Sequence, residues 1–560
     1  MKIKHYPIFI LALLIYSKAI SHEIISEDRD HGAIKCGTFL HEDKKKDILD
    51  KTMIYTHPRN LGMQRYHESP SGCFRIHYDI SNHDTIKNAV NLIDKNGNGV
   101  PDYVDSVAYY ADFAYNYYVT QYEYFPPCPD NGRGGSEQYD IYLVDLGNGK
   151  EGGTFYGLTY QEGTILPRRV YERFYSFLLL DNDYSSTDTT LLVNGEKVQT
   201  FKYFGYEAMK VTCVHELHHA IQFKYGIPSP RVAMFNELTS TYYEAEIFPD
   251  TPDYLQYVRS LFKDFENMPF GDGNYNNGYS WSIFGQYMNK KWDAYLLKRA
   301  WELIYEGIPT YRALDSAFKE YGTNLSDAWC EFLPWLYYTG GRAIGKEYFD
   351  NAAIFPMMEY YREDSFSPPS FTDNKALSPF EVRGFRCYFR SGEDFATDDT
   401  LDFIMTNTDL QSAIVQSQKK TEYTFVISDS HLPDMIRIDD SENYYSLSSE
   451  YPTFCNTLFF NAGVSTNRIG TAFPSPYRYG TDEAIFFPAP ENAEIYDEVE
   501  IIMYSSDMIE IYSMKLPVTV RNSYRVIRWD EVPDSFESGV YIYNIEFKGD
   551  NEFGKFAILR

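Results

Sequence analysis

Apolar side chains between residues 206 and 226 recur at helical spacing. Four of them, three or four positions apart, are Val211, Val214, Leu217 and Ile221. Side chains at this spacing share one face of an α-helix. The segment has no proline or glycine before Gly226, which is a common type of helix stop. The pattern therefore predicts a helix from about residue 206 to residue 225.

Helical periodicity continues, with many aromatic side chains, to about residue 350. Apolar positions repeat at intervals of three and four in residues 278–288, 300–304 and 313–318. Segments of this kind bury one face against their neighbours. We expect several helices here that mainly build a core.

The pattern changes to short alternating runs from about residue 356. Examples are residues 384–390 and 423–428, which Asp, Asn and Ser turns separate, and a proline-rich stretch at residues 367–371 marks the change. Earlier strands are predicted at residues 73–78 and 139–144. Alternation is typical of strands. The fold class we expect is α+β, with a mixed sheet lobe and a helical lobe followed by one or two β-sandwich modules.

The chain is acidic and rich in aromatic residues. Its 560 residues include 80 acidic and 51 basic side chains, for a formal charge of −29, and 52 tyrosines. This charge disfavours nucleic acid or an anionic membrane as a partner. It suits an extracellular protein that binds divalent cations, and it is equally a simple solubility feature.

The first residues resemble an export signal. Lys2 and Lys4 precede an apolar run at residues 8–15, and the small residues Ser17 and Ala19 flank Lys18. We expect cleavage after Ala19 and a secreted, extracellular protein, in solution or at the cell surface. An uncleaved anchor is the alternative, although the run is short for a bilayer. No other segment approaches transmembrane length.

The predicted helix at residues 206–225 contains the sequence His-Glu-x-x-His. His215 and His219 are one turn apart and can present both Nε2 atoms to one Zn²⁺, while Glu216 can activate a water molecule. His218 lies on a neighbouring face and is a poorer ligand. A catalytic zinc needs a third protein ligand, and Glu237 on the next helical segment is the candidate.

These residues resemble the gluzincins, or thermolysin-like metallopeptidases, in which Asn-Glu-x-x-Ser-Asp on the next helix supplies the third ligand. Asn236, Glu237 and Ser240 match that motif. Thr241 stands where the family has the Asp that orients a ligating imidazole. Glu244, seven residues after Glu237, is the substitute we propose. For both Glu237 and Glu244, the alternative is a position on a solvated helix face.

A gluzincin site also uses a Tyr or His that donates to the oxyanion of the tetrahedral intermediate. Tyr279, which follows Gly278 at an expected helix start, is the candidate, and Tyr275 is the second choice. An ordinary packing role is the alternative for either tyrosine.

A second motif has the spacing of a calcium-binding loop. Oxygen side chains occupy loop positions one, three, five, nine and twelve, with a glycine at six and a backbone carbonyl at seven. The six expected ligands are Asp94, Asn96, Asn98, Val100, Asp102 and Asp105. Position twelve is Asp where Glu would bind through both oxygens. We expect Ca²⁺ to stiffen this lobe and protect it from self-cleavage; a metal-free turn is the alternative.

The order of these features resembles a family of secreted bacterial metallopeptidase-like proteins of the gluzincin type, over about residues 70–350. The last few dozen residues resemble the β-domain that directs cargo through the type IX secretion pathway of Bacteroidetes-like bacteria. This resemblance implies that the secretion machinery or the cell surface is a partner. An immunoglobulin-like accessory domain is the alternative.

The seven cysteines allow several states. Cys213, in the helix with the histidines, is expected to stay free. The other six allow up to three bridges, or buried thiols, with no fixed connectivity. They are Cys36, Cys73, Cys128, Cys330, Cys387 and Cys455.

The chain is expected to contain six parts. They are a signal peptide at residues 1–19, an N-terminal segment and candidate propeptide at 20–70, an N-terminal lobe with the calcium-type loop at 71–205, a helical zinc-site lobe at 206–355, a β-sandwich accessory domain at 356–500, and a C-terminal β domain at 501–560.

The function we expect is hydrolysis of peptide bonds in a polypeptide substrate by a secreted zinc metallopeptidase. Glu216 would act as general base and then pass the proton to the leaving amine. One alternative is a catalytically silent zinc scaffold on a surface protein that binds polypeptide or glycan. Another is a metal-free pair of helix histidines at His215 and His219.

Overall fold

A computed structural model of the chain contains both helices and sheets, as the α+β prediction states. No helix in the described part combines the length and the apolar character that crossing a bilayer requires. The predicted signal peptide and much of the candidate propeptide lie outside the described residues. The described residues are 33–39, 62–82, 88–129, 131–148, 154–165, 170–192, 195–227, 233–272, 275–366, 370–389, 400–415, 421–428, 436–440, 443–447, 456–461, 472–482, 484–490, 493, 497–506, 508–521, 524–530 and 532–560.

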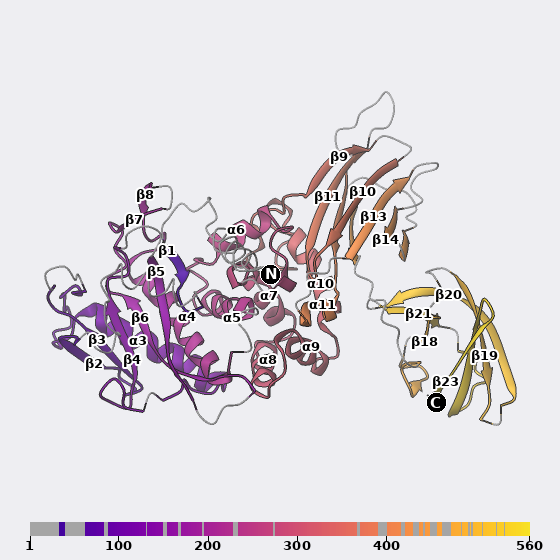
Figure 1. The fold of residues 1–560 in the computed structure, drawn as a ribbon, viewed down its shortest axis with the longest axis horizontal. Helices are drawn as coiled ribbons and strands as arrows, with labels where there is room; N and C mark the ends of the chain where they lie inside the picture. The colour runs from indigo at the N-terminus through magenta and orange to yellow at the C-terminus, as the bar shows by residue number, and fades with distance from the viewer. Residues whose placement is uncertain are drawn as a thin grey trace, which may run out of the picture. The chain divides into compact units, whose positions relative to one another are not determined.

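The first of two compact units contains the described residues of Met1–Gly163 and Phe174–Ile221 and is built on a six-stranded sheet (Figure 1). In spatial order the strands are β1 (Ala33–Cys36), β5 (Thr154–Thr164), β6 (Phe174–Asp181), β4 (Tyr139–Val144), β3 (Phe74–Tyr78) and β2 (Arg65–Glu68). β1 pairs parallel with β5, β4 is parallel to both β3 and β6, and β2 is antiparallel to β3. The strands predicted at residues 73–78 and 139–144 are thus confirmed as β3 and β4.

The helices of this unit pack beside the sheet. They are α3 (Asp102–Tyr115), which continues as the π-helix η2 (Asn116–Gln121), and the first part of α4 (Gly205–Tyr225); a small hairpin pairs β7 (Thr189–Leu191) with β8 (Lys197–Gln199). Helix α4 confirms the helix predicted from the apolar spacing. The division between the units falls inside α4 after Ile221, and not before residue 206, because Thr212 and Glu216 pack against strand β5.

The second unit begins with a helical region around an aromatic core. Its helices are α5 (Ala233–Ile247), α6 (Leu255–Lys263), η4 (Phe270–Asp272), α7 (Tyr275–Lys291), α8 (Tyr295–Tyr305), α9 (Thr310–Glu320), α10 (Leu325–Tyr337), η5 (Gly340–Arg342) and η6 (Ala352–Ile354). Trp281, Trp329, Phe284 and Phe332 are fully buried and contact one another. Each such ring removes a large apolar area from water. The predicted core-building helices are therefore present.

Two four-stranded sheets follow the helices. One has the order β10 (Ser370–Leu377), β13 (Thr421–Ser428), β14 (Ile436–Asp440), β15 (Asn443–Leu447); the other has β16 (Asn456–Asn461), β12 (Thr400–Thr406), β11 (Val382–Phe389), β9 (Arg362–Phe366). A short helix, α11 (Leu410–Ile414), connects β12 to the segment before β13. The change from helix to strand near residue 356 agrees with the alternating pattern in the sequence.

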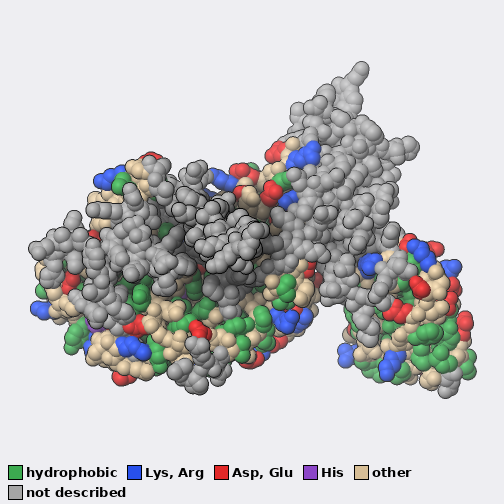
Figure 2. Space-filling view, in the orientation of Figure 1, with side chains coloured by type: hydrophobic (Ala, Val, Ile, Leu, Met, Phe, Trp, Pro, Cys, Tyr) green, Lys and Arg blue, Asp and Glu red, His purple; other side chains and the backbone are tan. Residues whose placement is uncertain are grey.

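The C-terminal part forms one seven-stranded sheet. Its strands, in spatial order, are β17 (Tyr477–Arg478), β23 (Asp550–Leu559), β22 (Gly539–Phe547), β19 (Glu498–Tyr504), β20 (Glu510–Arg521), β21 (Tyr524–Trp529) and β18 (Ile485–Pro488). The predicted division at residue 500 falls inside β19, because β17 and β18 are too short to give a pattern. In the face shown in Figure 2, acidic and basic side chains are interspersed over the described surface.

Asp402 on β12 ties the second of the four-stranded sheets to helix α10. Its two carboxylate oxygens each lie 2.7 Å from a nitrogen of Arg386, and Tyr337 of α10 donates a hydrogen bond of 2.7 Å. Burial opposes ionisation of Asp402, but these hydrogen bonds outweigh it and hold the pKa of the carboxyl below its ordinary value. The charged form is therefore the form that the fold stabilises.

We expect Asp402→Asn to destabilise this part of the protein by about 3 kcal/mol, because it leaves Arg386 largely buried without its charge partner. The contribution of Asp402 is complete above the ordinary carboxyl pKa of about 4 and disappears as the pH falls through the lowered folded-state pKa. Denaturant unfolding between pH 7 and pH 3 measures both effects. Asp530→Asn, at an exposed ion pair, is the control and should change stability by less than about 0.5 kcal/mol; equal losses for the two variants would contradict the assignment.

Candidate metal centre

Helix α4 brings the two motif histidines to one point. The Nε2 atoms of His215 and His219 lie 3.0 Å apart, and both side chains are fully buried. Two imidazole nitrogens that share a tetrahedral zinc at about 2.0–2.1 Å lie about 3.3 Å from each other. The pair is therefore arranged as one metal ion requires, in agreement with the one-turn spacing in the sequence.

Glu216 is held between the helix and strand β5. Thr159 Oγ1 lies 2.8 Å from Glu216 Oε2 and 2.7 Å from the carbonyl oxygen of the same residue, and Thr38 donates to Oε2 at 3.0 Å. Oε1 is buried and makes no hydrogen bond to the described residues. One carboxylate oxygen is thus fixed while the other keeps its capacity to accept a proton.

Gly157 allows β5 to approach α4 closely enough for these contacts. A Cβ atom at this position would lie 2.5 Å from Thr212 Cγ2 and 2.9 Å from Glu216 Cγ. Real side chains do not tolerate such distances, so any larger residue would separate the strand from the helix. The glycine therefore sets the position of Glu216 relative to the sheet.

Helix α5 carries Glu237, and Gln222 anchors α5 to the end of α4. The side-chain nitrogen of Gln222 donates to the carbonyl oxygen of Asn236 at 2.9 Å and lies 3.1 Å from the hydroxyls of Thr239 and Ser240. Because Gln222 is three residues after His219 on one continuous helix, these bonds fix α5 relative to the ligand face of α4. No pattern in the sequence indicates this role for Gln222.

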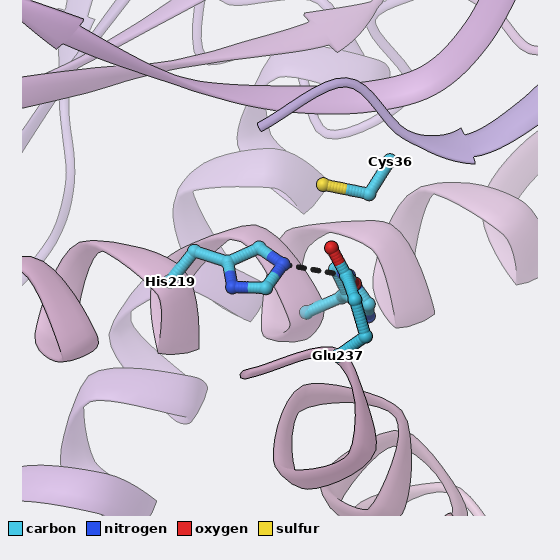
Figure 3. Close-up of side chains that lie close together, drawn as sticks. Cys36, His219 and Glu237 are labelled. Atoms are coloured by element: carbon cyan, nitrogen blue, oxygen red, sulfur yellow. Dashed lines mark hydrogen bonds between the residues drawn. The ribbon is translucent and has the colours of Figure 1, made fainter. Parts of the chain in front are cut away.

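The predicted ligands are joined by a thiol that the sequence analysis did not include. One donor atom each from Cys36, His215, His219 and Glu237 lies within 4.8 Å of every other, and all four residues are buried. Figure 3 shows the side chains of Cys36, His219 and Glu237 directed toward one another. Cys36 belongs to β1, which is more than 170 residues away in the chain, so only the strand pairing brings it here.

This set of donors suits zinc. Imidazole nitrogen, carboxylate oxygen and thiolate sulfur are the groups that bind Zn²⁺ in proteins. The buried Oε1 of Glu216 adds an acceptor beside the set. The residues therefore fit the metal that the motif predicts.

Comparison of the chain with family models, with curated proteins and with solved structures finds no match.

The structure selects one of the two states that the sequence left open for four of the cysteines. Cys36, Cys73, Cys128 and Cys330 form no disulfide bridge. Cys213 is free, as predicted. The spacing of cysteines in the sequence does not show which of them approach each other. Cys455 and the side chain of Cys387 lie outside the described part.

The other predicted positions near the motif are mostly buried. Thr241 and Glu244 lie on α5, and neither is exposed. Glu244 is therefore not on a solvated face, and its role as the orienting carboxylate stays a prediction. Tyr279 is buried near the start of α7, with its ring 5.1 Å from that of Tyr257, and its oxyanion role stays a prediction too. Tyr275 begins α7, and its side chain lies outside the described part.

His218 points away from the ligand pair, as its helix position predicts. Its ring packs against Tyr118 and Tyr124, with centroids 5.2 Å and 5.8 Å away. Burial first, and then the neighbouring histidines, lower the pKa of His218 well below the ordinary range. Tyr118 lies in the π-helix η2 and donates a hydrogen bond of 3.2 Å to the carbonyl of Val214. This side of α4 is thus a neutral packing face.

The calcium-type loop gathers several of its predicted ligands. The side-chain amides of Asn96 and Asn98 lie 2.9 Å and 2.8 Å from the same oxygen of Asp105. Asp94 accepts backbone N–H groups of the loop at 2.7 Å and 2.8 Å, and Asp102 accepts from Lys95 at 2.9 Å. Each oxygen of Asp94 and Oδ1 of Asp102 accepts one of these bonds and retains a second lone pair for a cation, whereas Oδ2 of Asp105 accepts both amides. The helix that follows, α3, starts at Asp102.

A second group of carboxylates was missed. Oxygens of Asp145, Asp181 and Asp188 lie within 4.8 Å of one another. Burial raises the pKa of Asp145 and raises that of Asp181 well above the usual range. Asp145 directly follows β4 and Asp181 ends β6, and the carboxyl ends of neighbouring parallel strands meet at one edge. The signal available in the sequence was that Asp145 and Asp181 stand at the ends of strands.

Gly278→Ala should weaken zinc binding. A Cβ atom here would lie 2.3 Å from the carbonyl oxygen of Met234 and 2.7 Å from Cβ of Glu237, so α7 would push against the helix that carries the ligand. We expect the zinc affinity to fall by about 10-fold or more, as when outer supports of metal ligands are removed. Competition with a chromophoric chelator measures it. The control is Gly163→Ala, which would have no atom within 4 Å of its Cβ. An unchanged zinc affinity in Gly278→Ala would contradict the role of α7 in supporting the helix that carries Glu237.

Calcium should raise the thermal stability of the first unit, and Asp105→Asn should reduce that gain. A cation present at about 100 times its dissociation constant adds about 2.7 kcal/mol to the folded state. Thermal unfolding and trypsin resistance, each with CaCl₂ and with a chelator, provide the measurements. Glu68→Gln removes an exposed carboxylate from the same unit and should respond to calcium like the unmodified chain. Identical behaviour of native protein in calcium and in chelator would refute the site.

Proposed function

We propose that this chain is a secreted zinc-dependent peptidase of the gluzincin type, which hydrolyses peptide bonds in polypeptides. The observation that carries the proposal is the convergence of His215, His219 and Glu237 beside Glu216 in a buried site. The ligand residues and the base candidate therefore occur together, as metal-assisted hydrolysis requires.

A bound zinc ion supplies Lewis acidity, which makes water nucleophilic near neutral pH. Glu216 accepts a proton from the attacking water through its unbonded oxygen Oε1 and returns it to the leaving amine. Thr159 holds the other oxygen, so the carboxylate keeps one orientation during both transfers. The helix pair α4 and α5 keeps the three ligands together through Gln222.

The edge of the sheet supports a polypeptide as substrate. Strand β5 passes beside Glu216 at Gly157, and β1 is the terminal strand that pairs with it. An extended peptide can add to the edge of a sheet through its main chain alone. In place of β1, such a peptide would pass next to the base.

One observation favours a second function, a catalytically silent zinc scaffold. Cys36 would complete a four-ligand set, and structural zinc sites are closed in this way. In that case the sheets after residue 356 would act as β-sandwich modules that bind polypeptide or glycan. The presence of Glu216 favours the enzyme, because a scaffold has no need of a base.

The C-terminal part is proposed to direct secretion or surface attachment. Its seven-stranded sheet has exposed apolar side chains at Ile509, Ile511, Val540 and Phe553. An immunoglobulin-like accessory role is the alternative. Extracellular localisation and calcium binding belong to the same proposal, since the loop at residues 94–105 would serve a protein that meets millimolar calcium.

Glu216→Gln tests the proposed peptidase. Cleavage of a mixed peptide library, before and after limited trypsin treatment, is compared with the bound zinc of each protein. We expect the variant to hold zinc and to cleave about 10²–10⁴-fold more slowly, because a general base contributes that much.

Glu207→Gln is the matched control for this test. It removes a largely exposed carboxylate in the first turn of the same helix and should leave cleavage unchanged. If the native chain and both variants bind zinc but none of them cleaves peptides, the result would favour the scaffold. Absence of bound zinc from the native chain would refute the metal centre itself.

A further inference from the structure

Residues 33–39 lie against the proposed centre at three points. Cys36 places its sulfur among the metal ligands, Thr38 donates to Oε2 of Glu216 at 3.0 Å, and the ring of Phe39 lies edge-on to His219 with centroids 5.1 Å apart. One segment of seven residues thus reaches His219, the cluster of metal ligands and the base Glu216.

The same segment occupies the edge of the sheet. In β1, Cys36 is the register partner of Gly157, and the next residue, Gly37, donates to the carbonyl of Gly157 at 3.0 Å. Gly157 is the position where β5 approaches Glu216. The place that an extended substrate would take is therefore filled by the chain's own N-terminal segment.

We propose that residues 33–39 are a built-in inhibitor, in which the Cys36 thiolate takes the fourth metal position and Thr38 restrains the base. This inference rests on the proposed zinc peptidase function. The site would be latent while the segment is in place, because four protein ligands leave no open position for water.

The local contacts suit a thiolate. The thiol must lose its proton to bind a metal, and the backbone N–H of Thr38 donates to Sγ of Cys36 at 3.2 Å, which stabilises the negative sulfur. The thiol is 3.0 Å from Thr38 Oγ1 and would give up that hydrogen bond on ionising. Thr38 keeps its backbone contact in both states, since Thr159 N–H donates to its hydroxyl at 2.9 Å.

The segment is attached through a short strand at the edge of the sheet, and such an attachment can be released. β1 has four residues, pairs with one neighbour and ends the sheet. Lys44, Lys45 and Lys46 lie between this segment and β2 in the sequence, and a trypsin-like peptidase cleaves after such residues. Cutting there would turn an intramolecular ligand into a dissociable peptide, which lowers its effective concentration.

Spectroscopy of the cobalt-substituted full chain tests the inference without relying on activity. A thiolate that binds Co²⁺ gives an intense charge-transfer band in the near ultraviolet, which nitrogen and oxygen ligands do not give. We expect the band in the uncut chain and its loss after trypsin treatment and removal of the N-terminal peptide, with cobalt still bound. Cobalt bound without the band in the uncut chain would overturn the inference and leave the metal centre intact.

Cys36→Ser supplies the second test, with Cys128→Ser as the matched control. Both residues are buried thiols of the first unit that form no disulfide bridge, but only Cys36 lies among the ligands. We expect uncut Cys36→Ser to bind cobalt without the charge-transfer band. We also expect it to cleave peptides at least about 10-fold faster than the uncut native chain, and a factor of 10 corresponds to about 1.4 kcal/mol of lost inhibition. Cys128→Ser should keep the band and the latency.

The two proposals fail in different ways. If the uncut native chain is as active as the trypsin-treated chain, the segment does not inhibit, although the peptidase stands. If cobalt does not bind to either form, the metal centre fails and the inhibitor falls with it. A band that persists in every active form would show that Cys36 is a permanent ligand and would overturn the inference. If Cys36→Ser does not fold, the spectra of the native chain before and after cutting still decide.

Discussion

Burial of ionisable groups around helix α4 is the constraint on which the rest of the structure depends. At the candidate metal centre, the imidazoles of His215 and His219, the carboxylates of Glu216 and Glu237 and the thiol of Cys36 are all buried. Removing one ion from water costs several kcal/mol even after relaxation of the protein, so such a group of side chains needs strong compensation. Hydrogen bonds to Glu216 supply part of it. A divalent cation among the ligands would supply the larger part, and the surrounding elements have the geometry to hold one.

The spacing between elements is set by small residues and by one amide. Gly157 brings a strand against α4, Gly278 brings α7 against α5, and Gln222 joins α4 to α5. None of these residues donates electrons to a metal. They matter because ligand positions must be correct within a fraction of an ångström, and a single additional methyl group at either glycine exceeds that tolerance.

The sequence was sufficient for the parts of the centre that depend on local geometry. His215 and His219 share a helix face whatever the rest of the fold does, and the helix periodicity of residues 206–225 and the alternation after residue 356 each reflect a local rule. Cys36 could not be assigned, because its place depends on a parallel pairing between β1 and β5, which local patterns do not specify. For the same reason the sequence left open whether the cysteines form bridges or remain thiols, and the group of Asp145, Asp181 and Asp188 was missed.

The π-helical turn η2 has a consequence for how this region tolerates change. A π turn contains one residue more than the α-helical turn it replaces, and each residue in a helix advances the side-chain direction by about 100°. Tyr118, within this turn, contacts His218 and donates to the carbonyl of Val214. Loss of a single residue between Asp102 and Tyr117 would rotate the tyrosine by about 100° about the helix axis, away from α4. The helix before the turn can therefore vary in composition far more easily than in length.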